Sequence, residues 1–259
     1  DHAYRSGLSG QNITVAVMDT GIVPHPDFED RIIYFKDFCN GRNEMYDDNG
    51  HGTHVSGIIA GNGKMSEQYV KGTAHNVRRY SGVAPRCKII MLKVLDENGN
   101  GNTKKVLDAV NWVKANRKLH HIRILNISVG MLPGAGLEEQ RKLLHAIDEL
   151  WDEGIMVVAA AGNNGPKENT VTIPGISRKV LTVGSSDDDT SDHGRKVLKT
   201  GYSGRGPTAC CIVKPEILAP GTGITSCSRD AMGYQVKSGT SMAAPVVSGA
   251  LALAFEKYP

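Results

Sequence analysis

Short apolar runs, separated by amphipathic helical patterns, constrain this chain more than any other feature of its sequence. Five runs have the length and β-branched content of buried strands: residues 13–18, 88–94, 122–127, 155–161 and 180–183. Between them, apolar residues recur at i, i+4 and i+7 in two sets, which predicts helices: Val106, Val110 and Val113, then Leu143, Ile147 and Leu150. Continuous apolar strands joined by helices are typical of a parallel sheet covered on both faces. We therefore predict an α/β fold with a mainly parallel central sheet and helices on both faces.

The 259 residues contain no linker-like segment and no internal repeat, so we predict a single domain over residues 1–259. The formal charge of +3 is small and the basic residues are scattered, which argues against nucleic-acid binding. No apolar run approaches the roughly 18 residues that a membrane-spanning helix needs. The N-terminus shows no signal-peptide pattern, although a signal or pro-segment already removed would leave no trace.

The five cysteines cannot all pair within the chain, and none has the C-x-x-C spacing of a metal or redox site. We therefore expect free thiols and a reducing compartment, the cytoplasm. Export, with one or two disulfides, is the alternative. Two polar stretches, Gly63–Ser81 and Ser185–Thr200, are expected to be surface loops. Either could hold a cation through its oxygens, but neither has the regular ligand spacing of an EF-hand.

One serine stands where a glycine-containing turn meets an apolar helix, in residues 238–254. Because Pro245 has no N–H, we place it in the first helical turn, so that the helix begins close to Ser241. A hydroxyl at a helix N-terminus lies near free N–H donors and the positive end of the helix dipole. This position suits a nucleophile whose attack creates an oxyanion. A simple N-cap is the alternative, since serine is a favoured cap.

Three further polar residues lie where predicted strands or helices begin or end. Asp19 ends the first strand, where a partly desolvated carboxylate needs a partner such as a histidine N–H. His51 lies between two glycines at the predicted start of a helix, and Asn163 follows the fourth strand. A strand-end cap and a turn asparagine are common alternatives for Asp19 and Asn163. His51 and His54 could in principle chelate a metal, but neither a glutamate of the H-E-x-x-H type nor a third ligand is evident. We therefore expect His54 to be a structural histidine.

Taken together, four motifs resemble those of the subtilisin-like serine proteases, the subtilases: residues 19–21 (DTG), 51–54 (HGTH), 161–163 (AGN) and 239–245 (GTSMAAP). Their order, Asp, His, then Ser, is the order in subtilisin. Other matching segments are residues 82–85, 202–208 and 214–221, so the resemblance covers essentially the whole chain. Residues 24–27 and 46–51 are most similar to the AprX-type intracellular subtilases of Gram-positive bacteria.

The resemblance implies a single subtilisin-like peptidase domain that hydrolyses peptide bonds through a serine nucleophile. Ser241 would attack the carbonyl, His51 would move the proton, and Asp19 would orient and stabilise the imidazole. Asn163 would donate to the oxyanion, together with the Ser241 backbone N–H.

The resemblance also implies where a peptide substrate binds as an added strand. One side would be Gly99, Asn100 and Gly101, and the other Ser128, Val129 and Gly130. The wall of the main specificity pocket would come from Val129, Gly130, Ala160, Ala161 and Gly162. That wall is apolar, so we expect a large apolar residue before the cut. Met131 replaces a glycine that is usual in the family and is expected to narrow the entrance.

No cofactor is expected for the chemistry, while a structural calcium ion stays open. Asp27 stands where the family has one calcium ligand, but its loop partners cannot be matched. The expected partners are polypeptide substrates and a propeptide or protein inhibitor, with no nucleic acid and no membrane. The expected location is the bacterial cytoplasm, or outside the cell after removal of a signal and pro-segment.

Two other functions are compatible with these residues. A catalytically silent subtilase fold could bind peptides or regulate a partner, because a blocked cleft leaves the motifs intact. A metal-dependent hydrolase would use His51 and His54.

Overall fold

The computed structural model describes residues 5–66, 80–132, 136–188, 201–230 and 232–259. Its strands are β1 (Thr14–Asp19), β2 (Ile32–Asp37), β3 (Lys88–Lys93), β4 (Ile122–Ile127), β5 (Met156–Ala160), β6 (Leu181–Ser185), β7 (Ile217–Ala219), β8 (Ile224–Cys227) and β9 (Tyr234–Lys237). Its helices are α2 (His51–Ala60), α3 (Thr103–Asn116), α4 (Leu137–Asp152) and α5 (Thr240–Lys257). The five apolar runs correspond to β1, β3, β4, β5 and β6, and the two periodic patterns to α3 and α4.

Seven strands form one sheet in the order β2-β3-β1-β4-β5-β6-β7. Every neighbouring pair in it is parallel, as the apolar runs predicted. The sequence did not predict β2 and β7, which lie at the two edges. It also did not predict the separate antiparallel ribbon of β8 and β9.

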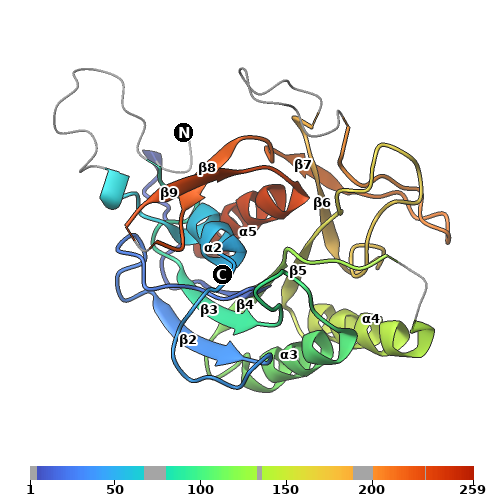
Figure 1. Cartoon of the computed structure of the whole chain (residues 1–259), viewed down its shortest axis with the longest axis horizontal. Helices are drawn as coiled ribbons and strands as arrows, with labels where there is room; N and C mark the ends of the chain where they lie inside the picture. Colours follow the sequence, from blue (N-terminus) through green and yellow to red (C-terminus); the bar gives the residue numbers. More distant parts are fainter. Residues whose placement is uncertain (1–4, 67–79, 133–135, 189–200, 231) are drawn as a thin grey trace.

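Alternate residues of the sheet pack into two separate cores. Val15 and Val17 of β1 lie in the core that also contains α2 and α5. Ala16 and Met18, from the same strand, lie in the core formed with α3 and α4. Figure 1 shows α2 and α5 on one side of the sheet and α3 and α4 on the other. The predicted α/β architecture, with helices on both faces of a parallel sheet, is therefore confirmed.

The parallel sheet places the polar residues of interest at one edge, since the carboxyl ends of parallel strands lie together. Asp19 is the last residue of β1. The segments that follow β3, β4 and β5 contain Gly99–Gly101, Ser128–Gly130 and Ala161–Asn163. The ribbon β8–β9 packs on α2, which begins with His51.

The two polar stretches are only partly described, because residues 67–79 and 189–200 lie outside the described ranges. The cation-binding hypothesis for these stretches therefore stays a prediction. Asp187 and Asp188 accept hydrogen bonds from backbone N–H groups, including those of Gly221 and Ser203. All five cysteines are free thiols. None of the helices described is long and apolar enough to cross a bilayer.

Candidate active site

His51 is the first residue of α2, and a close approach of two backbones sets its position. A Cβ atom on Gly52 would lie 2.2 Å from the Gly21 carbonyl oxygen. Only glycine therefore allows the first turn of α2 to pack against the turn that follows β1. This approach brings Nδ1 of His51 within 2.7 Å of Oδ1 of Asp19.

The electrostatics of the His51–Asp19 pair favour the imidazolium ion. Asp19 is fully buried, and its Oδ1 also accepts the Thr20 backbone N–H at 2.7 Å. Its Oδ2 has no hydrogen-bond partner within the described part of the chain. Burial lowers the pKa of His51, but the charge of Asp19 and the hydrogen bond to it together raise that pKa above its usual value. With Nδ1 donating to Asp19, Nε2 is the nitrogen left to accept a proton.

Asp47 and Lys93 fix the backbone around this pair, and the sequence analysis identified neither of them. Asp47 accepts hydrogen bonds from the Thr20 hydroxyl at 2.8 Å and from the Thr53 hydroxyl at 2.7 Å. It thereby joins the turn after β1 to α2. The Lys93 ammonium group is fully buried. It donates to the carbonyl oxygens of Thr20 and Leu95 and to the carboxylate of Asp48.

Ser241 is the second residue of α5, as expected from the glycine-containing turn, but the reasoning from Pro245 was wrong. Pro245 is the sixth residue of the helix and lies in its second turn. A residue there would normally donate its N–H to the Ser241 carbonyl oxygen. Because proline cannot, that oxygen accepts the Ser128 hydroxyl instead, at 3.3 Å.

The Ser241 side chain is not an N-cap, since Gly239 holds that position. Its hydroxyl donates to the Ser128 carbonyl oxygen at 2.9 Å, the one hydrogen bond it makes within the described ranges. Two bonds thus join Ser241 to Ser128, which with His51 lines the same groove. In this rotamer the hydroxyl contacts the groove wall rather than the imidazole.

Asn163 has a defined orientation relative to Ser241. Its Oδ1 accepts the Thr240 backbone N–H at 2.9 Å and the Thr240 hydroxyl at 3.1 Å. Because a backbone N–H can only donate, the amide oxygen must face Thr240. Nδ2 is therefore the group left to donate, on a side chain that is exposed to solvent.

The two predicted substrate-binding segments face each other across one groove of about 470 Å³. His51 lines this groove together with Gly99, Asn100 and Gly101 on one side and Ser128, Val129 and Gly130 on the other. Met131 also lines it and is held by backbone hydrogen bonds with Ile173.

The other two predicted substrate-binding residues, Ala161 and Gly162, do not line this groove. Ala161 is fully buried, and Gly162 lies behind Thr172, a residue that the sequence analysis missed. A Cβ on Gly130 would lie 2.2 Å from Thr172 Oγ1, and one on Gly162 would lie 2.6 Å from Thr172 Cγ2. The threonine side chain therefore occupies the space between these two glycines.

His54 has a structural position, as expected. Its Nε2 lies 3.1 Å from the carbonyl oxygens of both Ile224 and Gln235, one in each strand of the β8–β9 ribbon. Burial lowers its pKa to about 4, so the ring is neutral at pH 7. The two histidines do not form a metal-ligand cluster with a third residue in the part of the chain described.

Within the described residues, the surroundings of Asp27 are not those of a calcium ligand. Its carboxylate accepts hydrogen bonds from the Met65 N–H at 2.8 Å and the Tyr234 hydroxyl at 2.7 Å. Its backbone carbonyl accepts the guanidinium group of Arg31. Calcium needs six to eight oxygen ligands, whereas the described neighbours of Asp27 are hydrogen-bond donors, a thiol and an imidazole.

Known proteins resemble this chain over nearly its whole length. A sequence profile of the subtilase family matches residues 10–259. The chain is 39% identical to serine protease AprX of Bacillus subtilis (strain 168) over 272 residues, which cover 97% of the chain and 59% of AprX. It is 31% identical to subtilisin DY of Bacillus licheniformis, covering 100% of the chain and 82% of that protein. The chain thus spans less than two thirds of AprX.

Solved structures share the fold. Sphericase superposes with a TM-score of 0.78 at 29% identity, covering 97% of the chain and 79% of Sphericase. A cold-adapted subtilisin-like serine proteinase gives a TM-score of 0.74 at 30% identity, covering 96% of the chain and 77% of that structure.

Proposed function

This chain belongs to the subtilase family, and from that premise we propose that it is a serine endopeptidase with Ser241, His51 and Asp19 as its catalytic triad. One observation carries the proposal. The 2.7 Å bond between His51 and Asp19 lies beside a groove whose opposite wall, at Ser128, holds the Ser241 hydroxyl at 2.9 Å. A base, its orienting acid and a serine hydroxyl thus meet at one peptide-sized groove.

The reaction proceeds through two acyl transfers. The Ser241 hydroxyl turns from the Ser128 carbonyl to His51, and Nε2 takes its proton as Oγ attacks the peptide carbonyl. The imidazolium ion returns that proton to the leaving amine as the C–N bond breaks. Water, activated by the same nitrogen, then hydrolyses the ester and regenerates the serine. The buried Asp19 charge stabilises each imidazolium stage, in accord with the raised pKa of His51.

The tetrahedral oxyanion is stabilised by two donors that the protein holds in place beforehand. Asn163 Nδ2 is oriented because Thr240 occupies the amide oxygen. The Ser241 backbone N–H lies in the first turn of α5, where the helix supplies no acceptor. A donor of this kind lowers the barrier by about 3 kcal/mol.

Substrate binds as an extended strand between the two walls of the groove, and we expect an apolar residue before the cut. Val129 and Met131 are the apolar side chains along one wall. Thr172 fills the space between Gly130 and Gly162, so we expect it to limit how deeply the substrate residue before the cut can insert.

Thr172→Gly should therefore favour larger residues before the cut. We expect the ratio of kcat/KM for a phenylalanine substrate to that for an alanine substrate to rise by about 10-fold or more. Matched fluorogenic peptides measure this ratio within one protein sample, so differences in folded fraction cancel. Thr172→Ser, which keeps the hydroxyl and loses one methyl group, should give a smaller rise. An unchanged ratio in both variants would show that Thr172 does not limit the pocket.

Labelling with a serine-directed fluorophosphonate tests the proposed activity itself. Only an activated serine should react, so mass spectrometry should place a single adduct on Ser241, and His51→Ala should prevent it. An unlabelled protein that still binds peptides would instead be a catalytically silent fold. Hydrolysis that chelators abolish, without labelling, would indicate a metal-dependent enzyme.

The setting of the enzyme is part of the same proposal. Polypeptides are the substrates, and a propeptide or protein inhibitor fits the groove as a substrate-like strand. The domain extends over residues 1–259. We propose the bacterial cytoplasm as its location, on the strength of five cysteines that are all free thiols.

A further inference from the structure

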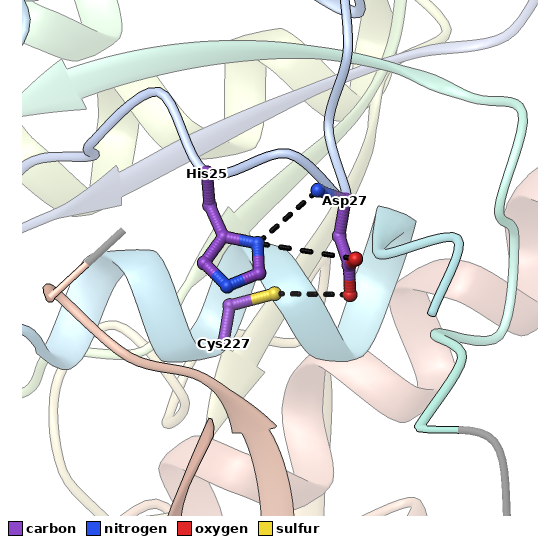
Figure 2. Close-up of side chains that lie close together, drawn as sticks. All are labelled: His25, Asp27 and Cys227. Carbon is purple, nitrogen blue, oxygen red and sulfur yellow. Dashed lines mark hydrogen bonds and ion pairs between the residues drawn. The ribbon is translucent and has the colours of Figure 1, made fainter. Parts of the chain in front are cut away.

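A cluster of three side chains lies apart from the groove, beside Gly57 in the second half of α2. His25 and Asp27 come from the segment after β1, and Cys227 is the last residue of β8. All three are buried. Figure 2 shows the imidazole ring and the thiol converging on the Asp27 carboxylate. One potential ligand atom from each residue lies within 4.8 Å of the other two.

Hydrogen bonds orient the lone pairs of this cluster. His25 Nε2 lies 3.0 Å from the Gly233 carbonyl oxygen and must donate to it, so Nδ1 carries the lone pair. Nδ1 accepts the Asp27 backbone N–H at 3.1 Å and lies 4.0 Å from Asp27 Oδ1. The Cys227 thiol donates toward Asp27 Oδ2 at 3.8 Å. A ring nitrogen, a carboxylate and a sulfur therefore lie within 4.8 Å of one another, and an ion bound between them would take the Nδ1 lone pair from the Asp27 N–H.

We propose that His25, Asp27 and Cys227 form a binding site for a thiophilic divalent cation, with Zn²⁺ as the physiological type. Nitrogen, oxygen and sulfur at usual zinc bond lengths are separated from one another by about 3.3–3.8 Å in a tetrahedral site. The observed separations are 4.0 Å from Nδ1 to Oδ1 and 3.8 Å from Sγ to Oδ2, and all three ligand atoms lie within 4.8 Å, so the side chains would have to close in by up to about 1 Å. The fourth position would be taken by water or the second carboxylate oxygen.

Ligand chemistry favours such an ion over calcium, because calcium takes oxygen ligands and this cluster offers a nitrogen and a sulfur. The Asp27 carboxylate accepts hydrogen bonds from Met65 N–H, Tyr234 and Cys227, as an ionised carboxylate does. When the ion binds, the thiol proton is released to solvent and a metal–sulfur bond replaces the S–H bond. One carboxylate and one thiolate then balance the two positive charges. Tyr234 and Met65 remain as donors that hold the carboxylate in position.

The bound ion would join two parts of the chain that are 200 residues apart in sequence. It would link the segment after β1 to the β8–β9 ribbon, which packs on α2. Two-stranded ribbons are marginally stable by themselves, so opening of the ribbon gives the ion a route to the buried site. We therefore expect the ion to stabilise the fold and not to take part in catalysis.

Cadmium binding tests the site directly, because a Cd²⁺–thiolate bond gives an ultraviolet charge-transfer band. The parent protein carries Ser241→Ala, which prevents self-digestion and separates this test from the proposed activity. It also carries Cys39→Ser, Cys210→Ser and Cys211→Ser, which remove the more accessible thiols. We expect one Cd²⁺ per chain, displaced by Zn²⁺ and not by Ca²⁺. Adding Cys227→Ser should abolish the band, whereas adding Cys87→Ser, at the other buried thiol, should leave it.

Thermal unfolding supplies an independent measurement. Zn²⁺ at about 100 times its Kd should raise the Tm of the parent by roughly 5–10 °C, and His25→Gln should remove most of that rise. If the parent protein shows neither the Cd²⁺–thiolate band nor a Tm rise with Zn²⁺, the proposal is overturned, and no cluster variant is needed for that conclusion. A band that persists in Cys227→Ser would also overturn it. If Cys227→Ser fails to fold by circular dichroism, an undiminished band and Tm rise in folded His25→Gln would overturn the proposal.

Discussion

Replacing Ser241 with alanine should lower kcat for a peptide substrate by about 10⁶-fold, because the acyl-enzyme can no longer form. His51→Ala should cost nearly as much, since the serine hydroxyl then lacks its base. The double variant should be no slower than either single variant, because the two residues act as one unit. Initial-rate assays with one fluorogenic peptide measure kcat for the two single variants and the double variant.

Binding provides the control for this prediction. Ser241→Ala leaves both walls of the groove intact. The Kd of a substrate-like peptide alcohol, which cannot react with the serine, should therefore change less than threefold. A loss of activity that tracks a loss of binding would point to a disturbed groove. A variant that retained a hundredth of the wild-type kcat would contradict the role given to Ser241.

Asp19→Asn should reduce kcat/KM by about 10⁴-fold and also move its pH dependence. The pKa of His51 is raised chiefly by the charge of Asp19 acting against burial. Activity needs the neutral imidazole, so in the wild-type protein it should fall as the pH drops through a value above 6.5. Removing the charge lowers the pKa of His51, and the acidic limb should shift to lower pH.

The pH profile of kcat/KM separates this electrostatic role from a purely structural one. Asp37→Asn is the matched control, because Asp37 is also buried but its carboxylate binds Cys39, Asn40, Arg42 and Tyr46. In Asp37→Asn, the acidic limb of the pH profile of kcat/KM should lie at the same pH as in the wild-type protein. An acidic limb that moves upward in Asp19→Asn, or stays in place, would show that Asp19 does not raise the pKa of His51.

The buried strands were predictable because burial on both faces requires continuous apolar residues. The edge strands were not. The β2 strand begins with a short apolar run, Ile32–Phe35, that the sequence analysis did not identify, and only its last residue, Asp37, is buried. The β7 strand has three residues, two of them exposed. The strands β8 (ITSC) and β9 (YQVK) are four residues long and mix polar with apolar residues, so neither gives an apolar run.

Motifs located the polar residues of the groove, whereas contacts between distant segments could not be inferred from them. Pro245 illustrates the difference: a proline in a second turn is costly in an isolated helix. Here the carbonyl that the proline leaves free is satisfied from another strand end, by Ser128. Thr172 was missed for a related reason, since its importance comes from two glycines that tertiary packing brings beside it.

The proline in α5 has a consequence for how substrate length affects turnover. It replaces a hydrogen bond within the helix by one to Ser128, so the proposed nucleophile is anchored to the backbone segment on which we propose that a peptide binds. An extended ligand that orders this backbone also steadies the attacking oxygen. Contacts several residues from the scissile bond can then speed bond cleavage as well as tighten binding.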